Sequence, residues 1–238
     1  MSRTKNISVV SSYATDRLIE ARPGKVIREQ KGGPVLYLAH ALEKHGLHPE
    51  IFTGEKLLVE ILVKQNDEFG SIKQKPERLP LPPIKTGSAI VSTILDEWDL
   101  SNAGEYPGLL FVDIQGYVRD GSDFGEKKAW EDVRNIAPFV FCLKGNTVEI
   151  GMLPPDIIEN QKKDKMLIVT KDKAGTEVFF RGNHVISAPS RIVHPPNTIG
   201  AGDTFFANFV YQFMTTDNVE SAAHFALDKT SEFLSKIK

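Results

Sequence analysis

Short, continuous apolar runs, separated by helical or polar stretches, constrain the fold of this chain more than any other feature. Such runs occupy residues 89–91, 109–112, 139–143 and 166–169, and a strand-like run over 7–11 opens the chain. Segments that are apolar throughout are typical of parallel strands buried on both faces, because helices cover each side of such a sheet. The pattern therefore predicts an α/β fold with a mostly parallel central sheet flanked by helices.

Polar residues follow several of these runs at the point where each predicted strand ends. Asp113, Asn146 and Thr170 stand at or just beyond three of the ends. Ligands of open α/β sheets bind beyond the carboxyl ends of the strands, so these side chains are expected at a common binding edge.

The remaining predicted elements indicate that residues 1–238 form a single domain. The sequence predicts a helix after Gly32-Gly33, a hairpin over 176–187, and two final helices near 204–214 and 219–237. Alternating residues from Val59 predict further strands, and four prolines between 73 and 83 predict a connector.

Composition narrows the functional classes. The 238 residues carry a formal net charge of −2, which offers no basic surface for nucleic acid. Neither an apolar stretch of the ~20 residues of a membrane helix nor a signal-peptide core is present, so no membrane partner is expected. The single cysteine, Cys142, reads as a core residue in a reducing compartment, and a cytoplasmic protein is expected.

The run Gly200-Ala201-Gly202-Asp203 precedes a strongly apolar helix and is the main candidate for chemistry. Small residues leave backbone N–H groups open, and the helix N-terminus attracts anions. The carboxylate of Asp203 could cap the helix or accept a proton from a hydroxyl, and for a generic helix the cap is the commoner role. The chain has no G-x-x-x-x-G-K-[ST] motif, and the run lacks the third glycine of a dinucleotide site, which makes a nicotinamide-dependent oxidoreductase a distant alternative.

Residues 197–203 resemble the D-T-x-G-A-G-D signature of the ribokinase-like, or PfkB-type, carbohydrate kinases and differ from it at Asn197. The resemblance implies a three-layer ribokinase-like sandwich with a small β lid. It also implies that Asp203 is the catalytic base and that Gly200, Ala201 and Gly202 form the anion hole for the transferred phosphoryl group. Such a site works mainly by positioning and charge stabilisation.

The same resemblance extends to residues that would hold the acceptor, a sugar, an inositol-like polyol or a nucleoside. Asp16 follows the first strand where the family has an acidic residue that hydrogen-bonds substrate hydroxyls, and Gly32 and Gly33 match the glycines of its first signature. Residues 113–119 look like a D-x-Q-G-x-x-R segment of inositol-kinase-like members, which would place Arg119 near substrate or phosphates; a surface arginine is the alternative.

Four further residues match the family's donor site, and they imply ATP and Mg²⁺ as cofactors. Asn146 and Glu149 fit the N-x-x-E motif, in which the glutamate organises the metal through water, and Thr170 and Gly175 fit the segment that contacts the nucleotide.

Departures from the family pattern keep a second function open. Asn197 replaces an aspartate that often helps to hold a monovalent cation, which puts potassium activation in doubt, and Asp172 replaces a glycine of the nucleotide segment. A catalytically weak or inactive protein that binds nucleotide or sugar is therefore the alternative to a kinase. The lid strands are expected within 13–31 and 59–73, and a homodimer through this lid is a further expectation.

Overall fold

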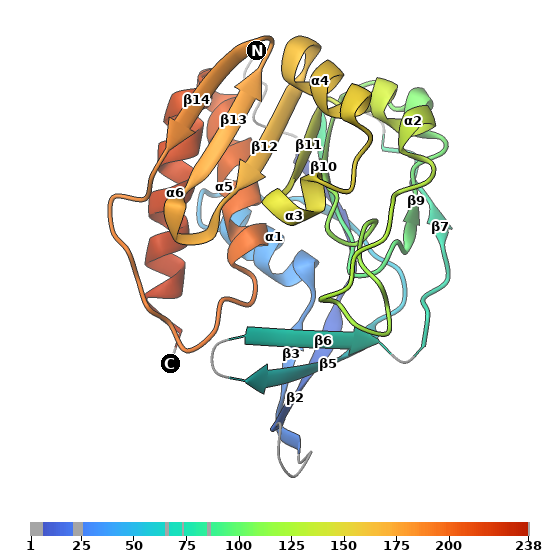
Figure 1. Cartoon of the computed structure of the whole chain (residues 1–238), viewed down its shortest axis with the longest axis vertical. Helices are drawn as coiled ribbons and strands as arrows, with labels where there is room; N and C mark the ends of the chain where they lie inside the picture. The colour runs from blue at the N-terminus through green and yellow to red at the C-terminus, as the bar shows by residue number, and fades with distance from the viewer. Residues whose placement is uncertain (1–6, 21–25, 65–66, 73, 85–86, 238) are drawn as a thin grey trace.

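The central element of the computed structural model, which describes residues 7–20, 26–64, 67–72, 74–84 and 87–237, is an eight-stranded sheet (Figure 1). Its strand order is β14-β13-β12-β11-β10-β8-β1-β4. Six neighbouring strands are parallel: β1 (Ile7–Ser11), β4 (Glu50–Phe52), β8 (Ser88–Ser92), β10 (Leu109–Asp113), β11 (Cys142–Asn146) and β12 (Met166–Thr170). The hairpin β13 (Thr176–Phe180) and β14 (Asn183–Ser187) continues the sheet in antiparallel fashion.

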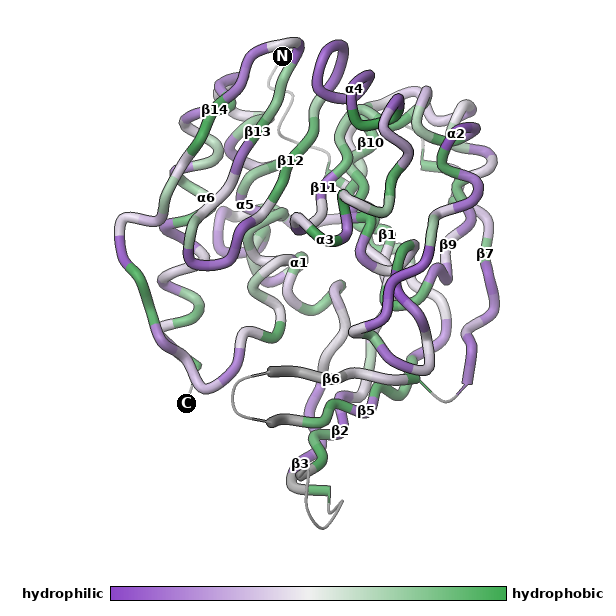
Figure 2. The backbone as a smooth tube through the Cα atoms, viewed as in Figure 1, coloured by the Kyte–Doolittle hydropathy of each residue, from purple (hydrophilic) through white to green (hydrophobic). Residues whose placement is uncertain are grey.

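Helices cover both faces of this sheet, because alternate residues of its strands point to opposite sides. One face packs against α1 (Pro34–Glu43), α5 (Ala201–Thr216) and α6 (Val219–Leu234). The other packs against α2 (Val133–Ile136), α3 (Thr147–Ile150) and α4 (Pro155–Asp164), with the 3₁₀ turns η2 (Ala103–Glu105), η3 (Ala137–Phe139) and η4 (Asp172–Ala174) in its loops. Figure 2 shows hydrophobic colour concentrated along the central strands, whereas the outer helix α4 is largely hydrophilic.

A separate small sheet lies below the carboxyl ends of the central strands in the view of Figure 1. Its strand order is β3-β2-β5-β6, formed by β2 (Ala14–Glu20), β3 (Val26–Gly32), β5 (Leu57–Lys64) and β6 (Asp67–Ile72). The β2–β5 pair is parallel and the other two pairs are antiparallel. A two-residue pair, β7 (Leu79–Pro80) with β9 (Trp98–Asp99), makes a third sheet. The predicted α/β fold, with a mostly parallel central sheet flanked by helices and a small second sheet, is thus confirmed.

The strand register brings the polar strand ends together. Ser11 of β1 pairs with Ser92 of β8, which pairs with Asp113 of β10. Asp113 pairs with Lys144 of β11. Functional side chains can therefore converge at this edge from strands that are far apart in the sequence.

One strand differs from the apolar pattern. A strand was predicted over 139–143, but β11 begins at Cys142 and continues to Asn146. Phe139 lies in the 3₁₀ turn η3 instead, where its side chain is 53% exposed. In the described part of the chain, no helix combines the length and apolar character needed to cross a membrane.

Candidate active site

Asp203 lies in the first turn of α5 and faces the end of β8. Its Oδ1 accepts a hydrogen bond of 2.9 Å from the Ser92 hydroxyl. Burial, together with the nearby Asp113 carboxylate, raises the pKa of Asp203 to about 6, although Lys144, the Ser92 bond and Arg119 act in the opposite direction. A carboxylate with a pKa near neutrality suits a general base, because it holds a proton more strongly than an ordinary aspartate and is still ionised at pH 7.

The backbone around Asp203 leaves hydrogen-bond donors free at the start of α5. Gly200 is the N-cap of α5 with φ of 80°, and no side chain caps the helix. Among the described residues, the N–H groups of Gly202 and Asp203 have no backbone or side-chain acceptor, whereas the Ala201 N–H is bonded to Thr198. Free donors at the N-terminus of a 16-residue helix favour an anion at this position.

The close packing of Gly200 explains why glycine stands there. A Cβ at this position would lie 2.3 Å from the ring of Tyr37 in α1. The turn therefore packs closely against Tyr37 of α1, a contact that no local pattern in the sequence indicates.

A buried ion pair lies beneath this turn. The Lys144 Nζ is 2.6 Å from Asp113 Oδ2, and the two residues are 4% and 1% exposed. Burial lowers the pKa of Lys144, but Asp113, Glu149 and Asp203 more than offset that effect, so the pKa is raised and the ammonium group stays protonated. A Cβ on Gly202 would lie 3.1 Å from the Lys144 nitrogen, which puts this positive charge directly against the anion turn.

Lys144 and Ser92 were both missed as site residues at the sequence level. Each had a signal, namely a polar residue at the end of an otherwise apolar strand. The lysine was read only as the end of a strand, because nothing local in sequence reveals Asp113 as its partner.

Arg119 supplies a second cation at the same edge. Its Nη1 donates to the Ile94 carbonyl at 3.1 Å, and its guanidinium carbon lies 4.1 Å from the centre of the Phe124 ring. Burial lowers the pKa of Arg119, while Glu149, Asp113 and Asp203 oppose this effect in that order. Its Nε is buried without a hydrogen-bond partner among the described residues, so the side chain retains donor capacity for a ligand.

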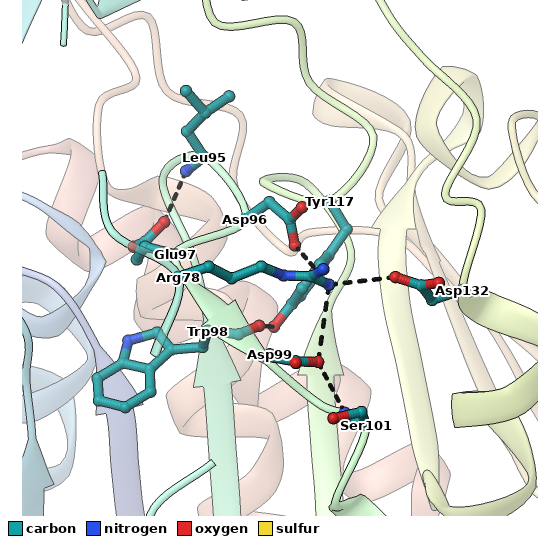
Figure 3. Close-up of polar contacts among 9 residues, drawn as sticks. All are labelled: Arg78, Leu95, Asp96, Glu97, Trp98, Asp99, Ser101, Tyr117 and Asp132. Carbon is teal, nitrogen blue, oxygen red and sulfur yellow. Dashed lines mark hydrogen bonds and ion pairs between the residues drawn. The ribbon is translucent and has the colours of Figure 1, made fainter. Parts of the chain in front are cut away.

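Acidic residues fix the loop after β8, whose Ile94 carbonyl accepts the hydrogen bond from Arg119, and Figure 3 shows the contacts of this loop around Glu97 and Arg78. The buried Glu97 carboxylate accepts from the Leu95 N–H at 2.7 Å and from the Ile94 N–H at 2.9 Å. These bonds orient the backbone whose Ile94 carbonyl accepts from Arg119. Beside them, Arg78 lies 3.3–3.8 Å from the carboxylates of three aspartates, Asp96, Asp99 and Asp132.

Asn146 and Glu149 form a reciprocal capping box at the start of α3. The Asn146 N–H donates to Glu149 Oε2 at 2.8 Å, and the Glu149 N–H donates to Asn146 Oδ1 at 2.9 Å. The pair therefore has a structural role, which the four-residue helix requires. Glu149 also acts electrostatically on Lys144 and Arg119, so its charge belongs to the site. The residues described contain no cluster of three or more potential metal ligands, and metal binding through water by Glu149 stays a prediction.

The predicted acceptor residues lie where the small sheet meets α1. Asp16 in β2 is 4% exposed, and a Cβ on Gly32 would lie 1.9 Å from its carboxylate oxygen. Gly33 is the N-cap of α1 with φ of 90°, and a Cβ there would lie 2.4 Å from the Ser12 carbonyl. The structure thus brings Asp16, Gly32 and Gly33 together, and Tyr37 of the same helix reaches the Gly200 turn.

Thr170 and Gly175 flank the turn between β12 and β13. The Thr170 hydroxyl donates to the Gly145 carbonyl at 3.4 Å. Gly175 has φ of 93°, and a Cβ there would lie 2.1 Å from the Ser187 carbonyl, so the turn alone accounts for this glycine. Asp172 in the same turn adopts φ of 46°. Contact of these residues with a nucleotide stays a prediction.

Part of the sequence that builds this site matches a known protein family. Residues 123–229, which include the Gly200 turn, match the model of the pfkB family carbohydrate kinases. Over these residues, which make up less than half of the chain, the sequence is similar to the PfkB, or ribokinase, family. A search of curated proteins found no match.

Solved structures of this family superpose over almost the whole chain. A pyrophosphate-dependent kinase in the ribokinase family, complexed with a pyrophosphate analog and myo-inositol, has a TM-score of 0.76 at 17% identity and covers 98% of this chain and 96% of its own. The Methanocaldococcus jannaschii nucleoside kinase has a TM-score of 0.71 at 15% identity, covering 97% and 92%. Ribokinase from Thermotoga maritima has a TM-score of 0.68 at 16% identity, and the match covers 98% of this chain and 94% of the ribokinase. At these identities the likeness is one of fold.

Proposed function

We propose that this protein is a kinase that transfers a phosphoryl group to a hydroxyl of a sugar, an inositol-like polyol or a nucleoside. The observation that carries the proposal is the Asp203 carboxylate, with its raised pKa, beside the N–H groups of Gly202 and Asp203, which have no acceptor in the described part of the chain. Asp203 takes the proton of the acceptor hydroxyl as the acceptor oxygen bonds to phosphorus. The bond between that phosphorus and the donor's bridging oxygen breaks, and the leaving phosphate keeps the electron pair.

The cations of the site complete this proposal. The turn of Gly200, Ala201 and Gly202 forms the anion hole, in which the N–H groups of Gly202 and Asp203 donate to the transferred group, while Lys144 and Arg119 offset its negative charge. Asp16, Gly32 and Gly33 bind the acceptor hydroxyls. Mg²⁺ would neutralise the donor phosphates, held through water by Glu149.

ATP is the donor that the sequence motifs predict, and pyrophosphate is the second candidate. Asp172 favours pyrophosphate, because it adds a carboxylate at a left-handed position of the segment expected to contact a nucleotide. Two structural relatives described as pyrophosphate-dependent, with TM-scores of 0.76 and 0.75, support the same choice. Lys144 and Arg119 can hold a phosphate anion that lacks a nucleobase, such as pyrophosphate.

The test is phosphoryl transfer followed by ³¹P NMR, with ATP or pyrophosphate as donor, Mg²⁺ present, and myo-inositol, ribose and adenosine as acceptors. We expect a phosphomonoester with at least one pair, and a rate at least about 100-fold lower in Asp203→Asn. The wild-type kcat/KM should rise with pH up to about 6, where Asp203 ionises. Binding of donor and acceptor without turnover would instead identify an inactive binding protein, and an unchanged rate in Asp203→Asn would refute the role of Asp203.

A further inference from the structure

A cavity of about 320 Å³ lies among α1, α5 and α6, on the helical side of the Gly200 turn. These three helices pack together on one face of the central sheet (Figure 1). Thr204 and Asn208 of α5 line the cavity, whereas the preceding residue Asp203 bonds to Ser92 of the sheet. The cavity is therefore separate from the proposed active site, and its volume is within the range of small-molecule sites.

Aromatic rings form the walls of this cavity. Tyr37 and Phe233 meet edge to face with ring centres 5.9 Å apart. Phe225 lies on the same helix as Phe233, and its ring centre is 5.3 Å from that of His45. A flat ring placed among them would make the offset or edge contacts that aromatic side chains favour.

Two polar residues that line this cavity, Asn208 and His45, are held in place by contacts within the protein. Asn208 is buried, its amide donates to the Thr204 carbonyl at 2.7 Å, and its Oδ1 is 2.7 Å from His45 Nε2. The His45 ring in turn stacks on Tyr211 at 4.1 Å. A ligand would thus meet a preformed surface.

The rim carries an excess of positive charge. Lys44 and Lys229 both line the cavity, and Lys229 is 3.1 Å from Glu232. The Lys44 ammonium group makes no hydrogen bond or ion pair with any residue that the structure describes. Burial lowers the pKa of Lys44, Lys236 and Lys229 lower it further by repulsion, and Glu232 only partly compensates. One lysine therefore remains free to pair with an anion.

From the aromatic walls and the unpaired Lys44 side chain we infer that this cavity is a second binding site, which takes a small organic anion with a flat ring. The ring would lie among Tyr37, Phe225 and Phe233, and its carboxylate or phosphate would pair with Lys44. The inference does not depend on the proposed kinase activity.

The test is titration of the full-length protein by NMR and calorimetry with four probes: phenyl phosphate, benzoate, benzyl alcohol and inorganic phosphate. We expect phenyl phosphate or benzoate to shift the ring resonances of Phe225 and Phe233. Benzyl alcohol, which lacks the anion, and inorganic phosphate, which lacks the ring, should each bind at least tenfold more weakly. Which of the two anions binds more tightly identifies the anionic group. Saturating pyrophosphate should leave this binding unchanged, because it occupies the other site.

Variants locate the site. Lys44→Glu should weaken binding at least tenfold, and Phe225→Leu at least threefold, whereas Lys163→Glu on α4, at the opposite face of the sheet, should have no effect. NMR spectra of each variant verify its fold. Failure of both aryl anions to bind, their displacement by pyrophosphate, or equal affinity in Lys44→Glu would overturn the inference.

Discussion

At the scale of single residues, the site is a group of buried side chains of opposite charge that lie close together. Two carboxylates, Asp113 and Asp203, lie near two cations, Lys144 and Arg119. Asp113 and Lys144 are paired directly, which leaves Asp203 with a serine hydroxyl as its hydrogen-bond partner and a carboxylate as a repelling neighbour. Such an arrangement costs stability, because it keeps the proposed base poorly solvated.

The first prediction concerns that cost. The pKa of Asp203 is about 6 in the folded protein and near 3.8 in an ordinary environment. The folded state therefore binds this proton more tightly, and the wild type loses stability as pH rises from about 4 to 6. The asparagine of an Asp203→Asn variant would keep an acceptor for Ser92 and carry no charge.

We therefore expect the stability of Asp203→Asn relative to the wild type to increase between pH 4 and pH 7, and to change little above that. Urea unfolding midpoints at a series of pH values measure the difference. Ser92→Ala is the control, because it removes the hydrogen bond and keeps the charge. A difference that is constant from pH 4 to 7 would contradict the raised pKa.

At the scale of elements, the N-termini of the 16-residue α5 and the four-residue α3 lie at the site, and each has a structural role beside its proposed chemical one. The capping box of α3 lets these two roles be separated. A glutamine in place of Glu149 can still accept from the Asn146 N–H but lacks the charge.

We expect Glu149→Gln to keep the free energy of unfolding within about 1 kcal/mol while raising the Mg²⁺ concentration for half-maximal rate about tenfold or more. Glu149→Ala should lose both cap and charge, at a further cost of about 1 kcal/mol. Urea unfolding and initial rates against Mg²⁺ check this pair. An unaltered Mg²⁺ dependence in the glutamine variant would show that Glu149 only caps the helix and does not help to bind the metal.

The start of α5 has a matched control in the same fold. Gly200 and Gly46 both have positive φ, 80° and 73°, but only Gly200 has a side chain, Tyr37, in the way of a Cβ. Gly46→Ala should cost about 1 kcal/mol of backbone strain, and Gly200→Ala clearly more, with loss of phosphoryl transfer. Unfolding midpoints and rates of both variants decide the matter. Equal losses of stability would show that Tyr37 does not constrain the turn.

These elements also show what the sequence could and could not predict. Apolar runs predicted the parallel strands except the three-residue β4, and polar residues after them predicted a shared polar edge, because both depend on local pattern. Lys144 interrupts its apolar strand yet lies inside it, since Asp113 on the neighbouring strand neutralises it. Tyr37 likewise supports a turn more than 160 residues away. Partners brought together only by the fold leave no local signal.

At the scale of the whole molecule, the small sheet is joined to the central sheet through the loop that carries Arg119. The Phe124 N–H donates to the Gly70 carbonyl at 2.7 Å, and the Ile72 N–H donates to the Gly121 carbonyl at 2.9 Å. The Phe124 ring packs against the core of the small sheet on one side and under the Arg119 guanidinium on the other. We therefore expect motion of the small sheet and the position of the Arg119 guanidinium to be coupled.

The last prediction tests that coupling with Phe124→Ala. Loss of the ring removes a cation–π contact of about 1 kcal/mol from Arg119, which corresponds to roughly fivefold weaker binding of the donor anion. It also removes a contact that docks β6, so hydrogen exchange should quicken in β5 and β6 and remain unchanged in α5 and α6. We expect the KM for the donor to rise more than kcat falls. Phe139→Ala is the control, because that ring is largely exposed in η3 and should affect neither measurement. Exchange that quickens throughout the molecule would mean that Phe124 supports the fold as a whole, and normal exchange with normal KM would mean that the two sheets are not coupled through this loop.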